Sequence, residues 1–545
     1  MAKRHRSDTS FRTLIMKRPF ERAAQLASLQ TNEFDILVIG GGATGLGTAV
    51  DAAARGYRVA VIDAYDFAKG PSSRSTKLVH GGVRYLSELQ FGLVREALEE
   101  RARICSNAPH LAHDLAFIVP RYHWWEGPFY GVGLKLYDAL AGTRNLGKSR
   151  SLSREETMRA IPNVKEEGLL GGVEYHDAQF DDARMALALA RTAASHSATV
   201  VNYARCVGLV KVEGQVVGAH VRDELGASGA SFKVRASVVI NATGVFADEL
   251  RRLDDSAAAA SIDPSRGVHL VLPREFLPAD HAIMVPHTDD GRVLFVIPWH
   301  GRTLVGTTDT AVKEAEIEPR ASSDEIGFIL RNAGRYLTRV PTQSDILSVY
   351  AGLRPLARAE ADTDTKKVSR EHSIEASASG LVTVTGGKWT TYRLMAEQAV
   401  DIAMETVGLE ARLCVTHDLH LHGYDEHSGQ TAGLPDARRV YGSDCAELEK
   451  IERADRLLAA PMHKHLPITP SQVIFAARAE MAHTVEDVLA RRTRCLLLDA
   501  RASMEIAEET ARLMGHELGW SASQAAASAA AYCVIARGYL PPAQS

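Results

Sequence analysis

The order of apolar and polar positions predicts an alternating α/β chain from Phe34 onward. The run "FDILVIG" (34–40) is short, apolar and rich in β-branched residues, which is typical of a strand buried on both faces. A glycine turn and an Ala-rich segment that ends near Gly56 predict a helix, and "RVAVID" (58–63) predicts a second strand. A strand–helix–strand unit of this length indicates parallel strands joined by a right-handed crossover.

The pattern changes from strands to helices toward the C-terminal end. Three later stretches have strand character: "ASVVINATG" (236–244), "VLFVIPW" (293–299) and "GLVTVTGG" (380–387). A helix is predicted directly after the last of them, and helical periodicity dominates beyond about residue 400. Within 503–518, one helix face would hold five apolar residues: Ile506, Ala507, Ala511, Met514 and Leu518.

The first 32 residues differ from the rest of the chain. They carry seven Lys or Arg residues against two acids and have no long apolar segment, which argues against a secretory signal. We interpret them as a disordered basic tail, with an Arg-rich organelle presequence as the alternative. The predicted units are therefore this tail (1–32), an α/β region (33–400) and a helical domain (401–545), with a linker near 400–430.

Composition narrows the class of protein. The chain has 545 residues, too many for one core, and its 46% hydrophobic and 24% charged content is that of a soluble globular protein. A net charge of -4 argues against a nucleic-acid partner, so an anion site would need a local concentration of cations. The six cysteines form no CxxC pair, which favours free thiols in a reducing compartment. The sequence contains no apolar run of about 18 residues, so it predicts no helix that spans a membrane.

A dinucleotide site is predicted between the first strand and the first helix. Gly40, Gly42 and Gly45 form GxGxxG there, and Asp63 follows at the end of the next strand. The glycines suit a tight turn, the approach of a pyrophosphate to the backbone and close helix–strand packing, while the acid suits a ribose hydroxyl. The motif alone does not separate NAD from FAD. A second helix opening at "TGGKWTTY" (385–392) favours a flavin, because its N-terminus would stabilise the reduced ring.

Ten stretches in one order resemble the FAD-dependent glycerol-3-phosphate dehydrogenases of the aerobic, membrane-associated type, over about residues 33–540. The stretches are "VIGGGATGLG", "SSRSTKLVHGGVRYL", "DDARMALALA", "NATGVFAD", "SRGVHLVLP", "FVIPW", "GTTDT", "GLRPL", "GGKWTTYR" and "EDVLARRTRCLLLDA". The resemblance implies a Rossmann-like FAD-binding domain interleaved with a mostly antiparallel β substrate-binding domain, plus a helical C-terminal domain. It also implies oxidation of sn-glycerol 3-phosphate at C2 to dihydroxyacetone phosphate, with hydride transfer to FAD and electrons passed to ubiquinone.

The resemblance also assigns roles to individual residues. Besides the glycine motif and Asp63, it implies flavin contacts from Ser73, Ser75, Lys77, Leu78, Thr243, Gly244, Gly387, Lys388 and Thr390. It places Arg84, Tyr85, His269, Arg354 and Lys388 in the substrate pocket. Fixed guanidinium groups suit a phosphomonoester, although a surface salt bridge is the alternative for Arg84.

We expect His269, Arg354 and Arg84 to be the catalytic residues. Histidine titrates near neutrality, so His269 is the candidate acceptor of the C2 hydroxyl proton. A satisfied core histidine and an arginine-assisted proton transfer are the alternatives. The histidines of "THDLHLH", His417, His420 and His422, have spacing that a metal could use, but the reaction needs no metal and we predict none.

Residues 121–142 combine six Phe, Trp or Tyr residues with flanking cations. Such a segment suits insertion into the interface of an anionic leaflet, and burial between domains is the alternative. We expect monotopic, peripheral attachment to the cytoplasmic face of the inner membrane. A homodimer remains an open alternative to a monomer.

Two other functions stay open at this point. A glycerol-3-phosphate oxidase, which passes electrons to O2, would share these motifs. A non-catalytic flavin sensor would bind FAD without being reduced by the substrate.

Overall fold

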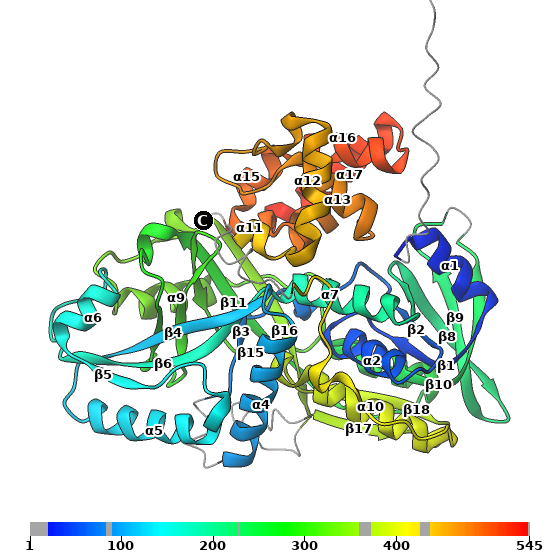
Figure 1. Ribbon diagram of the computed structural model, residues 1–545, viewed down its shortest axis with the longest axis horizontal. Helices are drawn as coiled ribbons and strands as arrows, with labels where there is room; N and C mark the ends of the chain where they lie inside the picture. The colour runs from blue at the N-terminus through cyan, green and yellow to red at the C-terminus, as the bar shows by residue number, and fades with distance from the viewer. Residues whose placement is uncertain (1–19, 83–89, 227–228, 359–371, 426–435, 543–545) are drawn as a thin grey trace, which may run out of the picture.

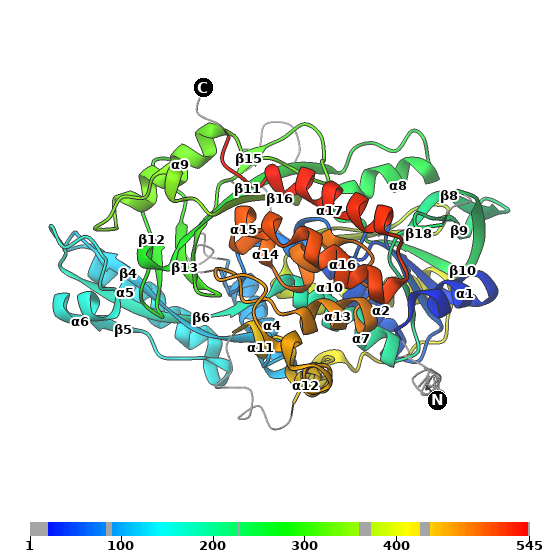
Figure 2. The same ribbon diagram turned by 90° about the horizontal axis from the view of Figure 1, so that it is seen from above.

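The computed structural model describes residues 20–82, 90–226, 229–358, 372–425 and 436–542. Two sheets lie side by side, and a layer of helices from the C-terminal end of the chain stacks on one side of both (Figures 1 and 2). This arrangement confirms the predicted fold class.

The first sheet is the nucleotide-type sheet, with the order β17-β18-β10-β1-β2-β7 and with β8 and β9 attached through β10. Its strands are β1 (Glu33–Ile39), β2 (Val59–Ile62), β7 (Thr199–Val201), β8 (Ala204–Val212), β9 (Gln215–Asp223), β10 (Ser231–Asn241), β17 (His372–Ala376) and β18 (Leu381–Gly386). Five of them run parallel at the centre. Their alternate side chains are buried on both faces, which explains why the predicted strands read as continuous apolar runs.

Helices α2 (Ala43–Ala54), α7 (Asp182–Ser195) and α10 (Tyr392–Val407) cover one face of this sheet. The β8–β9 hairpin and α8 (Ala247–Asp254) cover the other face. A Cβ at Gly47 would lie 2.8 Å from the Tyr392 ring, so this glycine lets α10 pack directly on α2.

The second sheet is mostly antiparallel and has the order β15-β11-β14-β13-β12-β4-β6-β3, with β16 and β5 beside β11 and β6. Its strands are β3 (Leu78–Val79), β4 (Ala112–Arg121), β5 (Arg150–Leu152), β6 (Gly171–Phe180), β11 (Ile262–Pro273), β12 (Ala282–Val285), β13 (Leu294–Trp299), β14 (Arg302–Gly306), β15 (Thr310–Ala311) and β16 (Ser348–Ala357). These strands fall between strands of the first sheet in the sequence, so the two sheets are interleaved as predicted. Helices α4 (Phe91–Asn107), α5 (Glu126–Ala141), α6 (Arg154–Ala160) and α9 (Ser323–Gly334) border it.

The C-terminal layer is helical. It contains α11 (Asp436–Arg439), α12 (Cys445–Ala454), α13 (Pro470–Ala479), a π-helix (Asp487–Arg492), α14 (Cys495–Leu498), α15 (Ala500–Glu505), α16 (Ala507–Leu518) and α17 (Ala522–Arg537). Four of the five apolar residues predicted to share a face in 503–518 are buried, and Leu518 packs partly buried against the same core. The predicted division at 400/401 falls inside α10, which continues to Val407 and ends at Gly408 in the left-handed conformation.

The prediction of a disordered tail over 1–32 is wrong for its last part. Residues Arg22–Thr31 form helix α1, and Leu29 is completely buried against the first sheet. The Arg22 guanidinium donates to the backbone oxygen of Asn202 at 3.0 Å and pairs with Asp223 at 2.6 Å. The sequence did not predict helix α1, because nothing near Arg22 distinguishes an arginine that pairs with a distant carboxylate from the other cations of a basic tail. Residues 1–19 lie outside the described residues.

Candidate active site

One large cavity, with a volume of about 1480 Å³, lies where the two sheets meet. Its wall includes the carboxyl ends of the parallel strands β1, β10 and β18 and side chains from β4, β6, β11 and β16 of the second sheet. Ligand pockets usually measure about 300–1,000 Å³, so this cavity has room for a dinucleotide and a second small molecule.

The glycine motif forms a tight turn at one end of the cavity. Gly40 has φ +119°, and a Cβ there would lie 2.4 Å from the Ala242 carbonyl oxygen. A Cβ at Gly45 would lie 1.9 Å from the Gly40 oxygen, which explains the close packing of α2 on β1. Gly42 is the N-cap of α2 and lines the cavity, so the free amides of this helix end point toward it. These features fit a bound pyrophosphate.

Asp63 lines the cavity beside this turn. One carboxylate oxygen accepts from the Gly41 amide at 2.6 Å, and the other accepts from the Tyr65 amide at 2.8 Å. Burial raises the pKa of Asp63 to about 6, although the two amides partly offset it. Each oxygen keeps a second lone pair, so the carboxylate can still accept from a ribose hydroxyl.

The serine-rich stretch divides between the cavity and the protein interior. Ser75 and Leu78 line the cavity, as do Ser72 and Thr76. Among the described residues of this stretch, Ser73 and Lys77 do not line the cavity. The Lys77 ammonium is completely buried and pairs with Asp182 at 2.6 Å. Burial lowers the pKa of Lys77 to about 7, with Asp182 acting in the opposite direction.

The Lys77 ammonium is held away from the cavity by Asp182, a buried carboxylate at the first position of α7 that lies 105 residues away in sequence. The flavin contacts that the resemblance implies for Ser73 and Lys77 stay predictions.

His269 lies on β11 directly opposite Tyr350 of β16 and lines the cavity. The Tyr350 ring stacks on the imidazole with ring centroids 4.8 Å apart, and Thr76 Oγ1 lies 2.9 Å from His269 Nε2. Burial, with Lys77 and Arg354 adding to it, holds the pKa of His269 well below its ordinary value of 6.5. The ring is thus neutral near pH 7 and suited to accept a proton. Tyr350 was missed because only the register of β11 and β16 brings it to His269, and Thr76 was missed because it lies 193 residues away in sequence.

Arg354 also lines the cavity, on the same face of the sheet as His269. Its guanidinium donates to the Thr308 carbonyl oxygen at 3.1 Å and to Thr307 Oγ1 at 3.2 Å, and it pairs with Asp309 at 3.3 Å. A Cβ at Gly267 would lie 2.6 Å from Arg354 Nη2, so the glycine makes room for it. The "GTTDT" stretch, which had no assigned role, fixes this arginine.

The remaining predicted contacts meet at the N-terminal end of α10. Thr243, Gly244, Gly387, Lys388 and Thr390 all line the cavity. The short 3₁₀ turn Trp389–Thr391 precedes α10, and the Trp389 indole donates to the Ser72 carbonyl oxygen at 3.0 Å. The helix end, the glycine turn and the serine stretch therefore adjoin one another in the cavity wall. Arg84 and Tyr85 lie outside the described residues, so their roles stay predictions.

Helix α5 forms an apolar part of the cavity wall through Phe129, Tyr130, Val132, Leu134 and Leu136. It lies at the outer edge of the second sheet (Figure 1). Three of these side chains also reach solvent: Phe129 is 58% exposed, Val132 70% and Leu136 41%. Trp124, just before the helix, is 80% exposed. Among the described residues, no helix is both long and apolar enough to cross a membrane.

The three histidines of "THDLHLH" do not converge. His420 stacks on Tyr424, and His422 pairs with Asp444 at 3.1 Å. His417 lies near Glu397 and Cys414, and donor atoms of these three residues fall within 4.8 Å of one another. The Arg393 guanidinium, however, bonds Glu397 at 2.8 Å and lies 3.6 Å from the Cys414 sulfur. A positive charge already occupies this position, so the group does not suit a metal cation.

Comparison with known proteins agrees with this geometry. Residues 35–400 match the family described as "FAD dependent oxidoreductase", and residues 414–525 match the family described as "C-terminal domain of alpha-glycerophosphate oxidase". The mitochondrial glycerol-3-phosphate dehydrogenase of Mesocricetus auratus is 40% identical over 93% of this chain and 74% of its own length. Glycerol-3-phosphate dehydrogenase 2 of Mycobacterium bovis is 40% identical over 93% of this chain and 88% of its own length.

A solved structure is similar over nearly the whole chain. It is the glycerol-3-phosphate dehydrogenase from Bacillus halodurans complexed with FAD, with 28% identity and a TM-score of 0.78. The similarity covers 97% of this chain and 99% of that one.

Proposed function

The chain belongs to the family of FAD-dependent glycerol-3-phosphate dehydrogenases, and on this premise we propose that it oxidises glycerol 3-phosphate at C2 to dihydroxyacetone phosphate. One observation carries the proposal. A single cavity combines a dinucleotide turn with a neutral, buried histidine and a fixed arginine on one face of the second sheet. Bound FAD supplies the two-electron acceptor, which no amino-acid side chain can replace.

Arg354 would bind the phosphate of the substrate. Its guanidinium is already oriented by Thr307, Thr308 and Asp309, so little side-chain freedom is lost when the phosphate binds. Arg84 and Tyr85 would complete the pocket, and Lys388 would contact the substrate or the flavin edge.

His269 would accept the proton of the C2 hydroxyl. The stack on Tyr350 and the contact between Thr76 and Nε2 hold its ring in one orientation, and its low pKa keeps the ring neutral at the start of the reaction. An arginine-assisted proton transfer is the competing assignment.

We infer that the electrons leave to a membrane quinone and that the enzyme attaches to the membrane surface through α5. The apolar side chains of α5 both line the cavity and face solvent, so a hydrophobic electron acceptor could reach the cavity from a lipid interface. Lys135 and Lys148, in and just beyond α5, are exposed cations suited to anionic lipids. Arg144 and Arg150 are exposed as well, but they pair with Glu99 and Glu174. We propose that this attachment is peripheral and on the cytoplasmic face of the inner membrane.

The test is an anaerobic titration of the purified holoenzyme with glycerol 3-phosphate while the visible flavin absorbance is followed. We expect bleaching in proportion to the substrate added and recovery of the absorbance when a ubiquinone analogue is supplied. A flavin that stays oxidised would refute the proposed reaction and favour a sensor. Recovery by O2 with a stoichiometric yield of peroxide, but not by the quinone, would identify an oxidase.

A further inference from the structure

The stretch "EDVLARRTR" has no role in the proposed reaction, yet it makes several buried polar contacts between the C-terminal layer and the cavity wall. Its residues Asp487–Arg492 form the π-helix, and all six are buried. The segment that they meet is residues 65–76, which leads from β2 to β3. Nine of its twelve residues line the cavity: Tyr65, Ala68, Lys69, Gly70, Pro71, Ser72, Arg74, Ser75 and Thr76.

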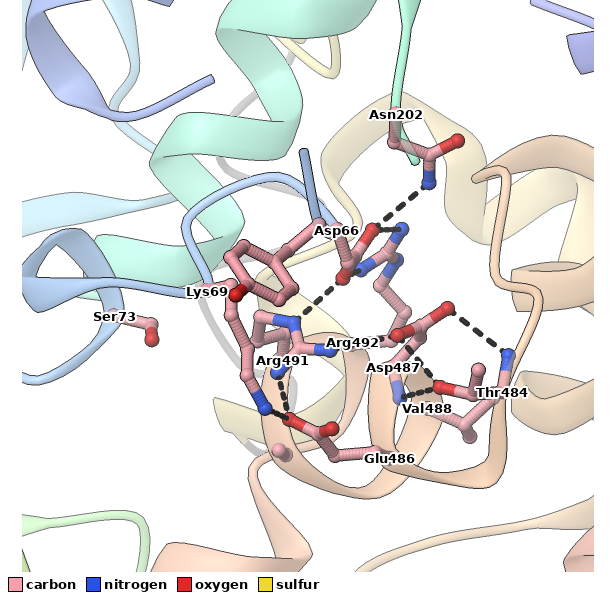
Figure 3. Close-up of polar contacts among 12 residues, drawn as sticks. Asp66, Lys69, Ser73, Asn202, Thr484, Glu486, Asp487, Val488, Arg491 and Arg492 are labelled. Atoms are coloured by element: carbon pink, nitrogen blue, oxygen red, sulfur yellow. Dashed lines mark hydrogen bonds and ion pairs between the residues drawn. The ribbon is translucent and has the colours of Figure 1, made fainter. Parts of the chain in front are cut away.

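Asp66 is the residue of this segment that makes the most polar contacts drawn in Figure 3, to Arg491, Arg492 and Asn202. It is completely buried and does not itself line the cavity. Both terminal nitrogens of Arg492 contact its carboxylate, one of them at 2.9 Å, and Arg491 Nε donates to it at 2.6 Å. The Asn202 amide adds a fourth contact at 3.1 Å. Burial raises the pKa of Asp66, but the two arginines more than offset this and hold it well below its usual range.

Two further contacts join the same elements. The Lys69 ammonium pairs with Glu486, which precedes the π-helix, and with Glu318 at 2.7 Å. Arg494, which follows the π-helix, donates to the Ser73 carbonyl oxygen at 2.8 Å. The segment is therefore bound near its beginning, middle and end by charged groups of the C-terminal layer.

The other side of this segment contacts the dinucleotide turn. Ser72 Oγ accepts from the Ala43 amide, the first residue of α2, at 3.0 Å. A Cβ at Gly42 would lie 3.0 Å from the same oxygen. A shift of the segment would thus change the space at the turn where a pyrophosphate would lie.

We propose that Arg491, Arg492 and Arg494 are positioning residues through which the C-terminal layer sets how tightly FAD is held. They line no part of the cavity and act through the segment 65–76. The inference rests on the proposed use of the cavity for FAD. Arg492 makes two of the four contacts to Asp66, and removing a partner from a buried group of charges leaves the remaining charges poorly compensated, so loss of Arg492 should displace Asp66 and loosen the segment.

The test compares Arg492→Met with a matched control, Arg184→Met. Arg184 is also a buried arginine that joins the C-terminal layer to the FAD domain, but it pairs with Glu480 at the end of α13 instead of with the segment. The variants are purified as holoenzymes and diluted, FAD release is followed by the recovery of flavin fluorescence, and thermal unfolding is measured by circular dichroism.

We expect Arg492→Met to release FAD at least tenfold faster than the wild type. Arg184→Met should lower the unfolding temperature but release FAD at the wild-type rate. Should Arg492→Met fail to fold, Asp66→Asn, which is nearly isosteric, replaces it with the same expectation. Release within twofold of the wild type, or equal acceleration in Arg184→Met, would overturn the inference. A wild-type protein that holds no FAD would instead refute the proposed function.

Discussion

Replacing Arg354 by methionine tests the phosphate site directly. Methionine keeps an unbranched apolar stem of similar length and removes the charge. Truncating one partner of a desolvated charged pair costs about 2–5 kcal/mol. The Arg354 side chain is 26% exposed, so solvent screens part of the interaction and the lower part of this range, about 2–3 kcal/mol, applies. At about 1.4 kcal/mol per factor of ten, kcat/KM for glycerol 3-phosphate should fall by roughly 30- to 150-fold.

The loss should appear mainly in KM. The phosphate is remote from the carbon that reacts, so Arg354 would bind the ground state and the transition state about equally. Steady-state kinetics with a quinone analogue measures both constants. Inhibition by inorganic phosphate, which competes for the same guanidinium, should weaken by a similar factor.

Arg358→Met provides the control on the same chain. Arg358 follows β16 and is exposed, and within the described residues its side chain makes one distant ion pair, to Asp263 at 3.8 Å, so its loss should change kcat/KM by less than about twofold. If Arg354→Met also stays within about twofold, the phosphate binds elsewhere and the assignment of this pocket is wrong.

The cavity and its wall lead to four other predictions. His269→Gln should lower kcat by about 10²–10⁴-fold, the usual contribution of a general base, as measured by single-turnover flavin reduction. Because the folded pKa of His269 lies below 6.5, the neutral ring persists as the pH falls, so the wild-type rate should stay level from pH 8 to 6.5 and decline only at lower pH; a decline centred above pH 6.5 would contradict this. Gly40→Ala should yield a folded protein without flavin colour, since its Cβ would lie 2.4 Å from a backbone oxygen, and a fully loaded variant would disprove the tight turn. Phe129→Asp combined with Val132→Asp should abolish sedimentation with anionic vesicles, whereas Leu457→Asp, an equally exposed position in the C-terminal layer, should not; equal sedimentation of both variants would argue against α5 as the contact.

Local sequence patterns predicted the parts of the fold that depend on local chemistry. The run that became β1, the glycine turn and α2 were all correct, because a strand buried on both faces and a turn with positive φ each restrict the residue types allowed. The burial of Ile506 and Met514 in one core was also predicted from helical periodicity, although the stretch forms two helices, α15 and α16, that meet at Ile506.

Long-range pairs could not be predicted in this way. Nothing near Lys77 in the sequence indicates that Asp182 would draw its ammonium away from the cavity, and nothing near Arg22 indicates Asp223. The stack of Tyr350 on His269 depends on the register of β11 and β16, which are separated by four other strands and helix α9 along the chain. These contacts depend on the tertiary fold, so local sequence preferences cannot predict them.

The interleaving of the two sheets affects how the enzyme is made. Strand β18 completes the nucleotide sheet, and it is followed by the 3₁₀ turn that ends at Thr391 and by the start of α10. All of these are synthesised only after the whole second sheet. The ribosome must therefore deliver about three-quarters of the polypeptide before a binding site for the flavin exists, and pairings over such long separations form slowly. We therefore expect cofactor loading only late in synthesis or after it, and a fragment cut between the sheets should expose unpaired strand edges instead of forming half an enzyme.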